Sequence, residues 1–249
     1  MEVNPPRRAP EWLTARPIAH RALHDGNDTV AENSLTAFQR AIESGFAIEC
    51  DLQVSATGEP VVFHDPDLER MTGIVGTVRS HTPQDLASMK LAGTSDTIAT
   101  LSTHLDQVAG RVPLILELKG VEGEDAGFVE GVADALKSYT GPVAVMSFDH
   151  WICAQFVKLL PNIPRGLTAF GDDDSAATHF RALVNYDLRF VSYGVADLPN
   201  RFVADAKSNN VPVITWTVRN EAQAKTTYRY ADQMTFELFD PNPIAAAHG

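Results

Sequence analysis

The feature that most constrains the fold is a regular alternation of short apolar segments with amphipathic, helix-like segments. Repeated strand–helix units are typical of a parallel sheet covered by helices. Eight apolar segments fit this pattern, and they begin at Ile18, Ile48, Leu114, Val143, Gly166, Phe190, Val213 and Met234. Eight such units in a chain of 249 residues match the usual size of a (β/α)8 barrel. The sequence therefore predicts an α/β fold with a single TIM-barrel domain over residues 1–249.

The helix predicted after the first strand has the clearest signals. Its apolar stripe consists of Leu35, Phe38, Ala41 and Ile42. Asn33 or Ser34 can cap its start, and Gly45 can end it. Further helices are expected at residues 126–137, 150–160, 175–184, 200–209, 221–230 and 243–247.

Residues from about 66 to 103 break the alternation. They follow a third extended run, residues 60–65, and contain only short apolar groups between turn residues. We expect an insertion of small helices and turns after the second strand, within the same domain and forming one wall of the site.

The balance of charges limits the partners of the chain. Its 20 Lys and Arg and 32 Asp and Glu give a net charge of −12 and a pI near 5.0. This argues against a broad surface for nucleic acid or anionic membranes, but allows a small local anion site. Two cysteines make no disulfide framework, no apolar run spans a bilayer, and residues 1–12 lack a signal-peptide core. We therefore expect a cytoplasmic protein without stable membrane insertion.

The strand containing Glu49 and Asp51 carries two acids in an otherwise apolar run. Alternate side chains of a strand share a face, so the two carboxylates lie close together while Cys50 faces the other way. They repel one another and are costly to bury unless a cation holds them. Glu117 lies on the next parallel strand. Three carboxylates, without a cysteine cluster or an HExxH helix, predict a site for Mg²⁺ or Ca²⁺ rather than zinc.

More polar side chains stand at the ends of predicted strands, where barrels of this kind bind their substrates. They are His20, Arg21, His64, Lys119 and Trp216. Arg21 and Lys119 can neutralise a phosphate and the charge it gains in the transition state. His20 and His64 can divide the proton transfers, one deprotonating an attacking hydroxyl and the other protonating the leaving alkoxide. This combination indicates cleavage of a phosphodiester.

Each of these residues also has an ordinary structural interpretation. Glu117 and Lys119 can form a simple ion pair, a single histidine can be a hydrogen-bonded core residue, and Trp216 can be core packing. Glu32 and Asp65 are equally well explained as loop or cap residues. The convergence of acids, histidines and cations at strand ends favours the catalytic interpretation.

At these residues the chain resembles the glycerophosphodiester phosphodiesterase family. The resemblance runs from about Pro17 to Trp216 and is carried by five motifs, Ala19-His20-Arg21, Glu32-Asn33-Ser34, Glu49-Cys50-Asp51, Val62-Phe63-His64-Asp65 and Leu116-Glu117-Leu118-Lys119. The run Leu68-Glu69-Arg70-Met71-Thr72 is also similar.

The resemblance implies roles for these residues as well as the barrel fold. It implies one divalent cation, Mg²⁺ or Ca²⁺, on Glu49, Asp51 and Glu117. It places the acid and the base at His20 and His64, and phosphate contacts at Arg21 and Lys119. The implied reaction is hydrolysis of a glycerophosphodiester to glycerol 3-phosphate and an alcohol. One route is attack by the neighbouring hydroxyl of the substrate, giving a cyclic phosphate that water opens.

Three positions depart from the family pattern. Ala22 and Ala31 replace a usual glycine and proline, and Glu237 stands near a usual aspartate. The methyl group of Ala22 disfavours a positive φ, so the loop after the first strand is expected to differ.

Two other functions stay open at this stage. A phospholipase-type diesterase acting on lysolipid or other lipid phosphodiesters would need an exposed apolar rim or a basic face, and the sequence shows neither clearly. A protein that binds glycerophosphodiesters without turnover would not need two histidines opposite a metal. Phe148, Tyr193 and Trp216 are candidates to line the pocket for the alcohol.

Overall fold

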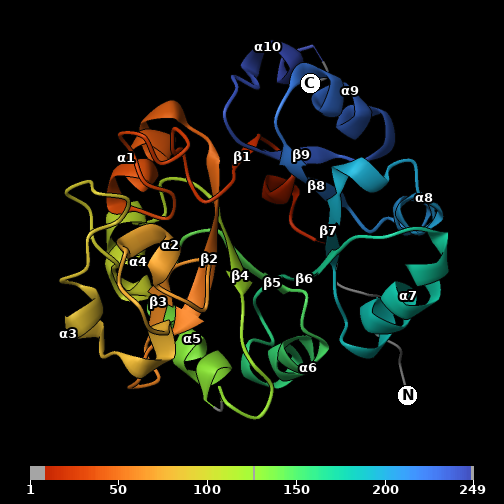
Figure 1. Ribbon diagram of the computed structural model, residues 1–249. Coiled ribbons are helices and arrows are strands. Elements are labelled where there is room, and N and C mark those ends of the chain that lie inside the picture. Colours follow the sequence, from red (N-terminus) through yellow and green to blue (C-terminus); the bar gives the residue numbers. More distant parts are fainter. Residues whose placement is uncertain (1–8, 126, 248–249) are drawn as a thin grey trace. The chain divides into compact units, whose positions relative to one another are not determined.

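The computed structural model describes residues 9–125 and 127–247, drawn as a ribbon in Figure 1. Contacts divide the chain into two compact units, residues 19–143 and residues 1–18 together with 144–249. Residues 1–8 of the proline-rich lead, and the predicted start of a helix at Ala126, lie outside the described residues.

Nine strands in the described part of the chain form one sheet, in the order β1-β9-β8-β7-β6-β5-β4-β2-β3, and β1 also pairs with β2. β2 pairs in parallel with β4, and the strands from β5 to β9 pair in parallel in succession. The short strand β3 (Pro60–Val62) instead pairs antiparallel with β2. This closed order of eight strands, with β3 outside it, is that of a (β/α)8 barrel, so the predicted fold class is confirmed.

The strands of the barrel begin within one residue of their predicted positions. They are β1 (Ile18–Ala19), β2 (Ala47–Val54), β4 (Leu114–Leu118), β5 (Val143–Ser147), β6 (Arg165–Ala169), β7 (Phe190–Gly194), β8 (Val213–Val218) and β9 (Gln233–Phe236). Nearly all of their residues are buried, as expected for parallel strands covered on both faces.

The helices follow the strands. In the unit of residues 19–143 they are α1 (Leu35–Ser44), α2 (Glu69–Thr72), α3 (Pro83–Leu86), α4 (Leu101–Val108) and α5 (Phe128–Leu136). In the other unit they are α6 (His150–Leu159), α7 (Ala176–Asn185), α8 (Arg201–Ser208), α9 (Glu221–Tyr230) and α10 (Asn242–Ala245). All six helices predicted at residues 126–247 are present, with ends shifted by a few residues.

Helix α1 begins and ends as its sequence predicts. Of the two candidate caps, Ser34 is the one used, because its Oγ accepts a hydrogen bond of 3.1 Å from the backbone N–H of Ala37. Gly45 ends the helix with a φ of 73°, a conformation that glycine adopts without steric cost. The side chain of Asn33 is therefore left for another role.

The insertion after β3 is built from small helices and turns, as predicted, but its end was placed too late. Thr100 caps α4 through a hydrogen bond from the N–H of Thr103, so residues 101–103 are the first turn of a longer helix. In the ribbon, α4 lies beside α1 (Figure 1). The insertion proper therefore ends before Leu101.

The insertion has a small apolar core of its own. Side chains from the insertion and from β3 form one buried cluster, which includes Val61, Phe63, Leu68, Met71, Val78 and Leu86. Leu68 and Met71 flank Arg70, a residue of the short helix α2. The cluster therefore fixes the insertion, and α2 in particular, against β3.

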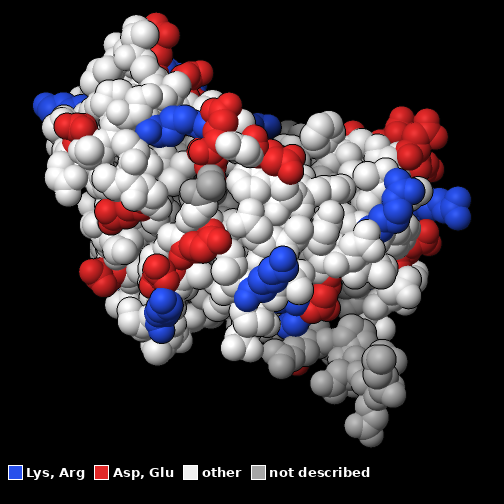
Figure 2. All heavy atoms as spheres, turned by 90° about the horizontal axis from the view of Figure 1, so that it is seen from below, with Lys and Arg blue, Asp and Glu red and all other residues white. Residues whose placement is uncertain are grey.

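Charged side chains of both signs are interspersed on the face shown in Figure 2, and the described residues make no continuous basic area there. No helix in the described part of the chain is long and apolar enough to cross a membrane.

Candidate active site

Three buried carboxylates meet at β2 and β4. Asp51 of β2 is directly opposite Glu117 of β4 in the parallel register, and Glu49 lies two residues before Asp51 on the same face. One oxygen from each of the three acids lies within 4.8 Å of the other two. All three residues are at most 5% exposed. The structure thus brings together the three predicted metal ligands.

Two cations contact this acidic cluster. Lys119 Nζ forms an ion pair with Glu117 and lies 3.3 Å from Asp51 Oδ1. Arg21 Nε lies 3.5 Å from Asp51 Oδ2, and the backbone N–H of Arg21 donates a 2.9 Å hydrogen bond to Glu49 Oε2. The ion pair between Glu117 and Lys119, considered above as an ordinary structural explanation, is therefore present within a larger group of charges.

The two cations do not neutralise the cluster completely. Burial, together with the nearby carboxylates of Asp51 and Glu117, raises the pKa of Glu49 well above its usual value. Burial also raises the pKa of Glu117, against the opposing charge of Lys119. For Asp51, burial is outweighed by Lys119, His64, Arg21 and His20, which together lower its pKa. Asp51 is therefore the acid that stays ionised, and Glu49 is the one that most needs an additional positive charge.

This cluster fits a divalent cation. Its donors are carboxylate oxygens, which are the ligands that Mg²⁺ and Ca²⁺ prefer. The raised pKa of Glu49 means that a proton or another cation must supply the missing charge. A bound metal ion would supply it and would release the proton.

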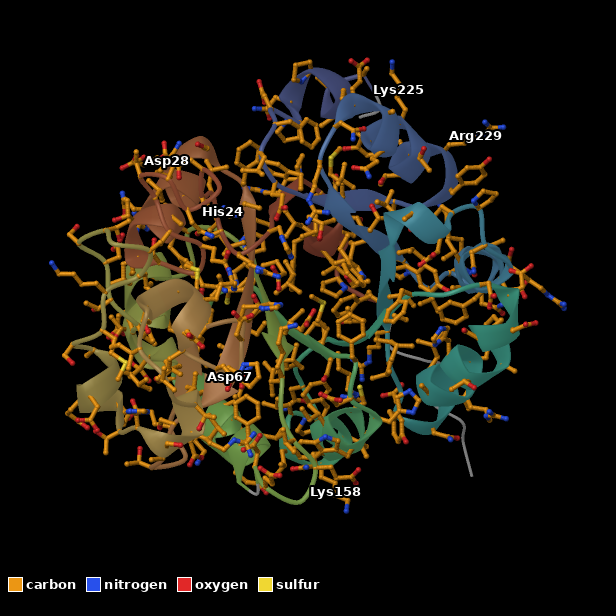
Figure 3. The ribbon with its side chains drawn as sticks, in the orientation of Figure 1. His24, Asp28, Asp67, Lys158, Lys225 and Arg229 are labelled. Atoms are coloured by element: carbon orange, nitrogen blue, oxygen red, sulfur yellow. The ribbon has the colours of Figure 1, made fainter. Side chains whose placement is uncertain are left out.

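The loop between β1 and α1 carries the next group of site residues. His24 and Asp28, labelled in Figure 3, belong to this loop. Asp25 holds its turn together, because Oδ1 accepts hydrogen bonds from the backbone N–H groups of Asp28, Thr29 and Val30 at 3.0–3.1 Å. The loop therefore has a defined conformation from which its side chains can be aimed.

The start of this loop keeps an unusual backbone conformation. Arg21 and Ala22 have φ angles of 50° and 63°, in the left-handed region. Their N–H groups both point at Glu49, one to its side chain and one, at 3.0 Å, to its carbonyl oxygen. Ala22 thus adopts the positive φ that its methyl group disfavours, and the expected difference of this loop from that of the family stays a prediction.

Asn33 supports the acidic cluster from the end of the same loop. Its Nδ2 donates a 2.9 Å hydrogen bond to Asp51 Oδ2, and its Oδ1 accepts one of 3.3 Å from the backbone N–H of Asp51. The φ of Asn33 is 57°, a conformation that asparagine tolerates better than most residues. Sequence reasoning considered Asn33 only as a helix cap, and its position beside Glu32 in a motif was the available signal.

Both predicted histidines are close enough to Asp51 to lower its pKa. His20 directly follows β1. His64 follows β3, and the side-chain amide of Gln53 donates a 2.9 Å hydrogen bond to its carbonyl oxygen. His64 Nδ1 lies 2.5 Å from Asp65 Oδ1, so the carboxylate accepts a hydrogen bond from Nδ1–H.

Glu32 and Asp65, which the sequence left undecided, belong to one network of charges. Glu32 Oε1 accepts hydrogen bonds from Arg21 Nη1 at 2.8 Å and Arg70 Nη2 at 2.7 Å. Asp65 Oδ2 accepts one of 2.5 Å from Arg70 Nε. Burial would raise the pKa of Glu32, but the hydrogen bond from Arg70 and the charge of Arg21 lower it to about 2. Arg70 had no predicted role; its place in a motif-like run was the signal.

Trp216 lies in the other unit, on β8. Its indole N–H donates a 3.2 Å hydrogen bond to the carbonyl oxygen of Ser192, and its ring packs edge-to-face with Phe148 at a centroid distance of 5.4 Å. Its contact with substrate stays a prediction. Glu237, also in this unit, accepts a 2.7 Å hydrogen bond from Arg219 Nε.

Comparisons with known proteins agree with this geometry. The model of the glycerophosphoryl diester phosphodiesterase family matches residues 20–235. A Bacillus subtilis (strain 168) protein, YhdW, whose name as a glycerophosphodiester phosphodiesterase is provisional, is 27% identical over 220 residues, or 83% of this chain and 87% of the relative. A glycerophosphodiester phosphodiesterase of Caldanaerobacter subterraneus subsp. tengcongensis is 30% identical over 162 residues, or 60% of this chain and 65% of the relative.

A solved structure supports the fold. The phosphodiesterase of Oleispira antarctica, in complex with its product sn-glycerol-3-phosphate, superposes with a TM-score of 0.83 at 23% identity. The match covers 94% of this chain and 97% of the other. The family match spans most of the chain and includes the acids and histidines of the site. The chain therefore belongs to the glycerophosphoryl diester phosphodiesterase family, which is a family of enzymes.

Proposed function

We propose that the chain is a metal-dependent phosphodiesterase that hydrolyses glycerophosphodiesters to glycerol 3-phosphate and an alcohol. The observation that carries this proposal is the cluster of three buried carboxylates, contacted by two cations and approached by two histidines. A phosphodiester needs positive charge around its phosphate and proton transfer at both the attacking and the leaving oxygen. The cluster contains groups for each of these tasks.

The charges of the cluster suit an anionic substrate once a divalent ion is present. Three carboxylates with Lys119 and Arg21 carry a net charge of −1, which a proton on Glu49 brings to zero. Replacing that proton by a divalent cation gives a net charge of +1. A phosphodiester carries one negative charge, so the loaded site and the substrate are complementary. When bound on Glu49, Asp51 and Glu117, the metal would act as a Lewis acid toward a phosphate oxygen.

The protein's own side chains would then perform the remaining steps. Arg21 and Lys119 would bind the phosphate oxygens, and their charge would stabilise the negative charge that grows in the transition state. One histidine accepts the proton of the attacking hydroxyl as the new P–O bond forms. The other donates a proton to the alcohol oxygen as the old P–O bond breaks. Attack by the neighbouring glycerol hydroxyl gives a cyclic phosphate, which water then opens to glycerol 3-phosphate.

The test is release of the alcohol, choline or ethanolamine, from glycerophosphocholine, glycerophosphoethanolamine and a choline lysolipid, in EDTA and after adding back Mg²⁺ or Ca²⁺; the small diesters should release glycerol 3-phosphate in equal amount. We expect activity on the small diesters that EDTA abolishes and one of the two ions restores. Activity that is indifferent to EDTA would exclude the metal. A preference for the lysolipid would favour the phospholipase-type alternative.

Histidine variants test the proton transfers. His20→Ala and His64→Ala should each lower kcat by about 10²–10⁴-fold, the usual contribution of general acid–base catalysis. His81→Ala is the matched control, because His81 bonds through Nδ1 to the Thr77 carbonyl oxygen in the insertion. A His20 or His64 variant that keeps near-wild-type turnover removes that histidine from the mechanism.

A further inference from the structure

We propose that Arg70 is a positioning residue of this site, which orients His64 through Asp65 and Arg21 through Glu32. The inference rests on the proposed function and adds to it a residue from the insertion. Arg70 lies on α2, outside the strands of the barrel, and touches neither the carboxylate cluster nor the histidines through any contact found in the described residues. It reaches the site only through two acids.

The first arm of this arrangement ends at His64. Arg70 Nε donates a 2.5 Å hydrogen bond to one oxygen of Asp65, and the other oxygen accepts from His64 Nδ1, also at 2.5 Å. A carboxylate that accepts from Nδ1–H fixes the tautomer and the ring orientation, and leaves Nε2 for proton transfer. Burial would raise the pKa of Asp65, but Arg70 and His64 lower it, so the acid stays an acceptor.

The second arm ends at Arg21. The two terminal nitrogens of Arg70 donate to the two oxygens of Glu32, at 2.7 and 3.2 Å. The Oε1 atom of Glu32 is shared with Arg21 Nη1 at 2.8 Å. Asn27 Nδ2 adds a hydrogen bond of 2.8 Å to Oε2. Glu32 is therefore held on both oxygens, and in turn it fixes the guanidinium that faces Asp51.

Only arginine can make both arms at once. Its planar guanidinium offers Nε to one acid and a two-pronged fork to the other, whereas a lysine ammonium is a single point of charge. A role in stabilising the fold explains the presence of an arginine here poorly. The Arg70 side chain is 44% exposed, and exposed ion pairs contribute little to the free energy of folding. The apolar core of the insertion, which includes the neighbouring Met71, holds α2 at the place from which Arg70 reaches both acids.

The first experiment compares kcat in Arg70→Met, Arg70→Lys and the wild-type protein. A misplacement of a catalytic group by about 1 Å can cost about 10²-fold in rate, so we expect kcat to fall by about 10–100-fold in Arg70→Met, with little recovery in Arg70→Lys. Arg79→Met is the control. Arg79 is also an insertion arginine that pairs with two acids, Glu124 and Asp125, and its loss should change kcat less than threefold.

Double-mutant cycles separate positioning from a general loss of structure. If Arg70 acts through Asp65, then Arg70→Met should have little further effect on kcat in an Asp65→Asn background. If it acts through Glu32, Arg70→Met should raise the inhibition constant of glycerol 3-phosphate, because Arg21 is no longer held in place. This rise should disappear in a Glu32→Gln background. A purely structural role predicts effects that add in both backgrounds. Additivity in both, or a loss in Arg70→Met no larger than that in Arg79→Met, would overturn the proposal.

A spectroscopic readout does not depend on turnover. Nitrogen NMR of ¹⁵N-histidine protein, at a pH high enough that the histidine signals no longer move with added base, should show His64 as the Nδ1–H tautomer in the wild type, with the signal assigned by loss in His64→Gln. In Arg70→Met the signal should move toward a mixture of tautomers, and in Arg79→Met it should not. An unchanged His64 signal in Arg70→Met would contradict the first arm even if no diester proved to be a substrate. Absence of turnover in the wild type would count against the proposed function alone.

Discussion

Ala22 has a backbone conformation that is unfavourable for alanine, and hydrogen bonds to Glu49 hold it there. Its φ of 63° belongs to the left-handed region, which disfavours residues with a Cβ by about 1–2 kcal/mol. In return, the turn aims the N–H of Arg21 at the buried carboxylate of Glu49 and the N–H of Ala22 at the carbonyl oxygen of Glu49, and buried polar groups such as these need hydrogen bonds. The backbone here acts as part of the site.

Replacing Ala22 by glycine should therefore be tolerated. Relief of the left-handed strain offsets the loss of a buried methyl group and the extra chain entropy of glycine, so the free energy of unfolding should stay within about 0.5 kcal/mol of wild type. Ala37→Gly removes an equally buried methyl group, but from the helix α1, and should cost about 1–2 kcal/mol. Urea unfolding of the two variants measures the difference. Equal losses would show that the φ at position 22 carries no strain.

At this same scale, the sequence indicates some site residues and not others. Glu49 and Asp51 could be paired by strand periodicity alone, because residues two apart share a face. The Asn33–Asp51 hydrogen bonds and the Arg70 bridge could not, since they join residues 18 and 38 positions apart along the chain through loops. Loop geometry depends on turn conformations, and spacing does not encode those.

Among the secondary-structure elements, α4 was the one missed. Its buried face is Leu101, His104, Leu105 and Val108, which has ideal helical spacing. A histidine in the middle of that face interrupts the apolar pattern; no helix was predicted here, and residues 101–103 were included in the insertion. In the structure His104 is buried against the ring of Phe38 of α1, with a centroid distance of 4.4 Å.

The burial of His104 makes the stability of this helix pair depend on pH. His104 Nδ1 donates to the Thr100 carbonyl oxygen, and burial lowers the pKa of His104 from 6.5 to about 4. The unfolded chain therefore takes up the proton first. The contribution of the neutral ring is complete above about pH 6.5 and is lost as the pH falls toward 4, by up to about 3 kcal/mol.

The prediction is tested by urea unfolding at several pH values between 4 and 7.5 in wild type and His104→Leu. The free energy of unfolding should fall more steeply with acid in the wild type, because the variant lacks this one titration. Other titrating groups are common to both proteins and cancel in the difference. Parallel curves would mean that His104 accepts its proton in the folded state as readily as in the unfolded chain.

For the molecule as a whole, the barrel fold could be predicted from the sequence, whereas the first strand and the bounds of the insertion were harder to place. Parallel strands buried on both faces are short apolar runs, and helices on the outside are amphipathic, so β4 to β9 and their helices could be read in order. The short β1 was located only because polar site residues follow it. The insertion broke the rhythm, and its own apolar core has no periodic pattern. Its end could have been placed only from the helical spacing that begins at Leu101.

Metal binding should stabilise the whole folded chain if the proposed site is correct. An ion at about 100 times its Kd adds about 2.7 kcal/mol, which for a protein of this size raises Tm by roughly 5–10 °C. Thermal unfolding with EDTA, Mg²⁺ and Ca²⁺ measures the shift and ranks the ions. Glu49→Gln and Asp51→Asn should lose most of it. A Tm that responds equally in these variants would place the ion elsewhere.

Lys119 and Arg21, which contact the three carboxylates, also bear on whether the chain folds before or after it binds a metal ion. Many small metal-binding domains stay unfolded until their ion arrives, because their ligands cannot be assembled without it. In the proposed site, Lys119 and Arg21 offset part of the charge of the three carboxylates, and a proton on Glu49 can offset the rest. If the site does bind an ion, its ligands would thus be assembled before the ion arrives, and loading would be a step separate from folding.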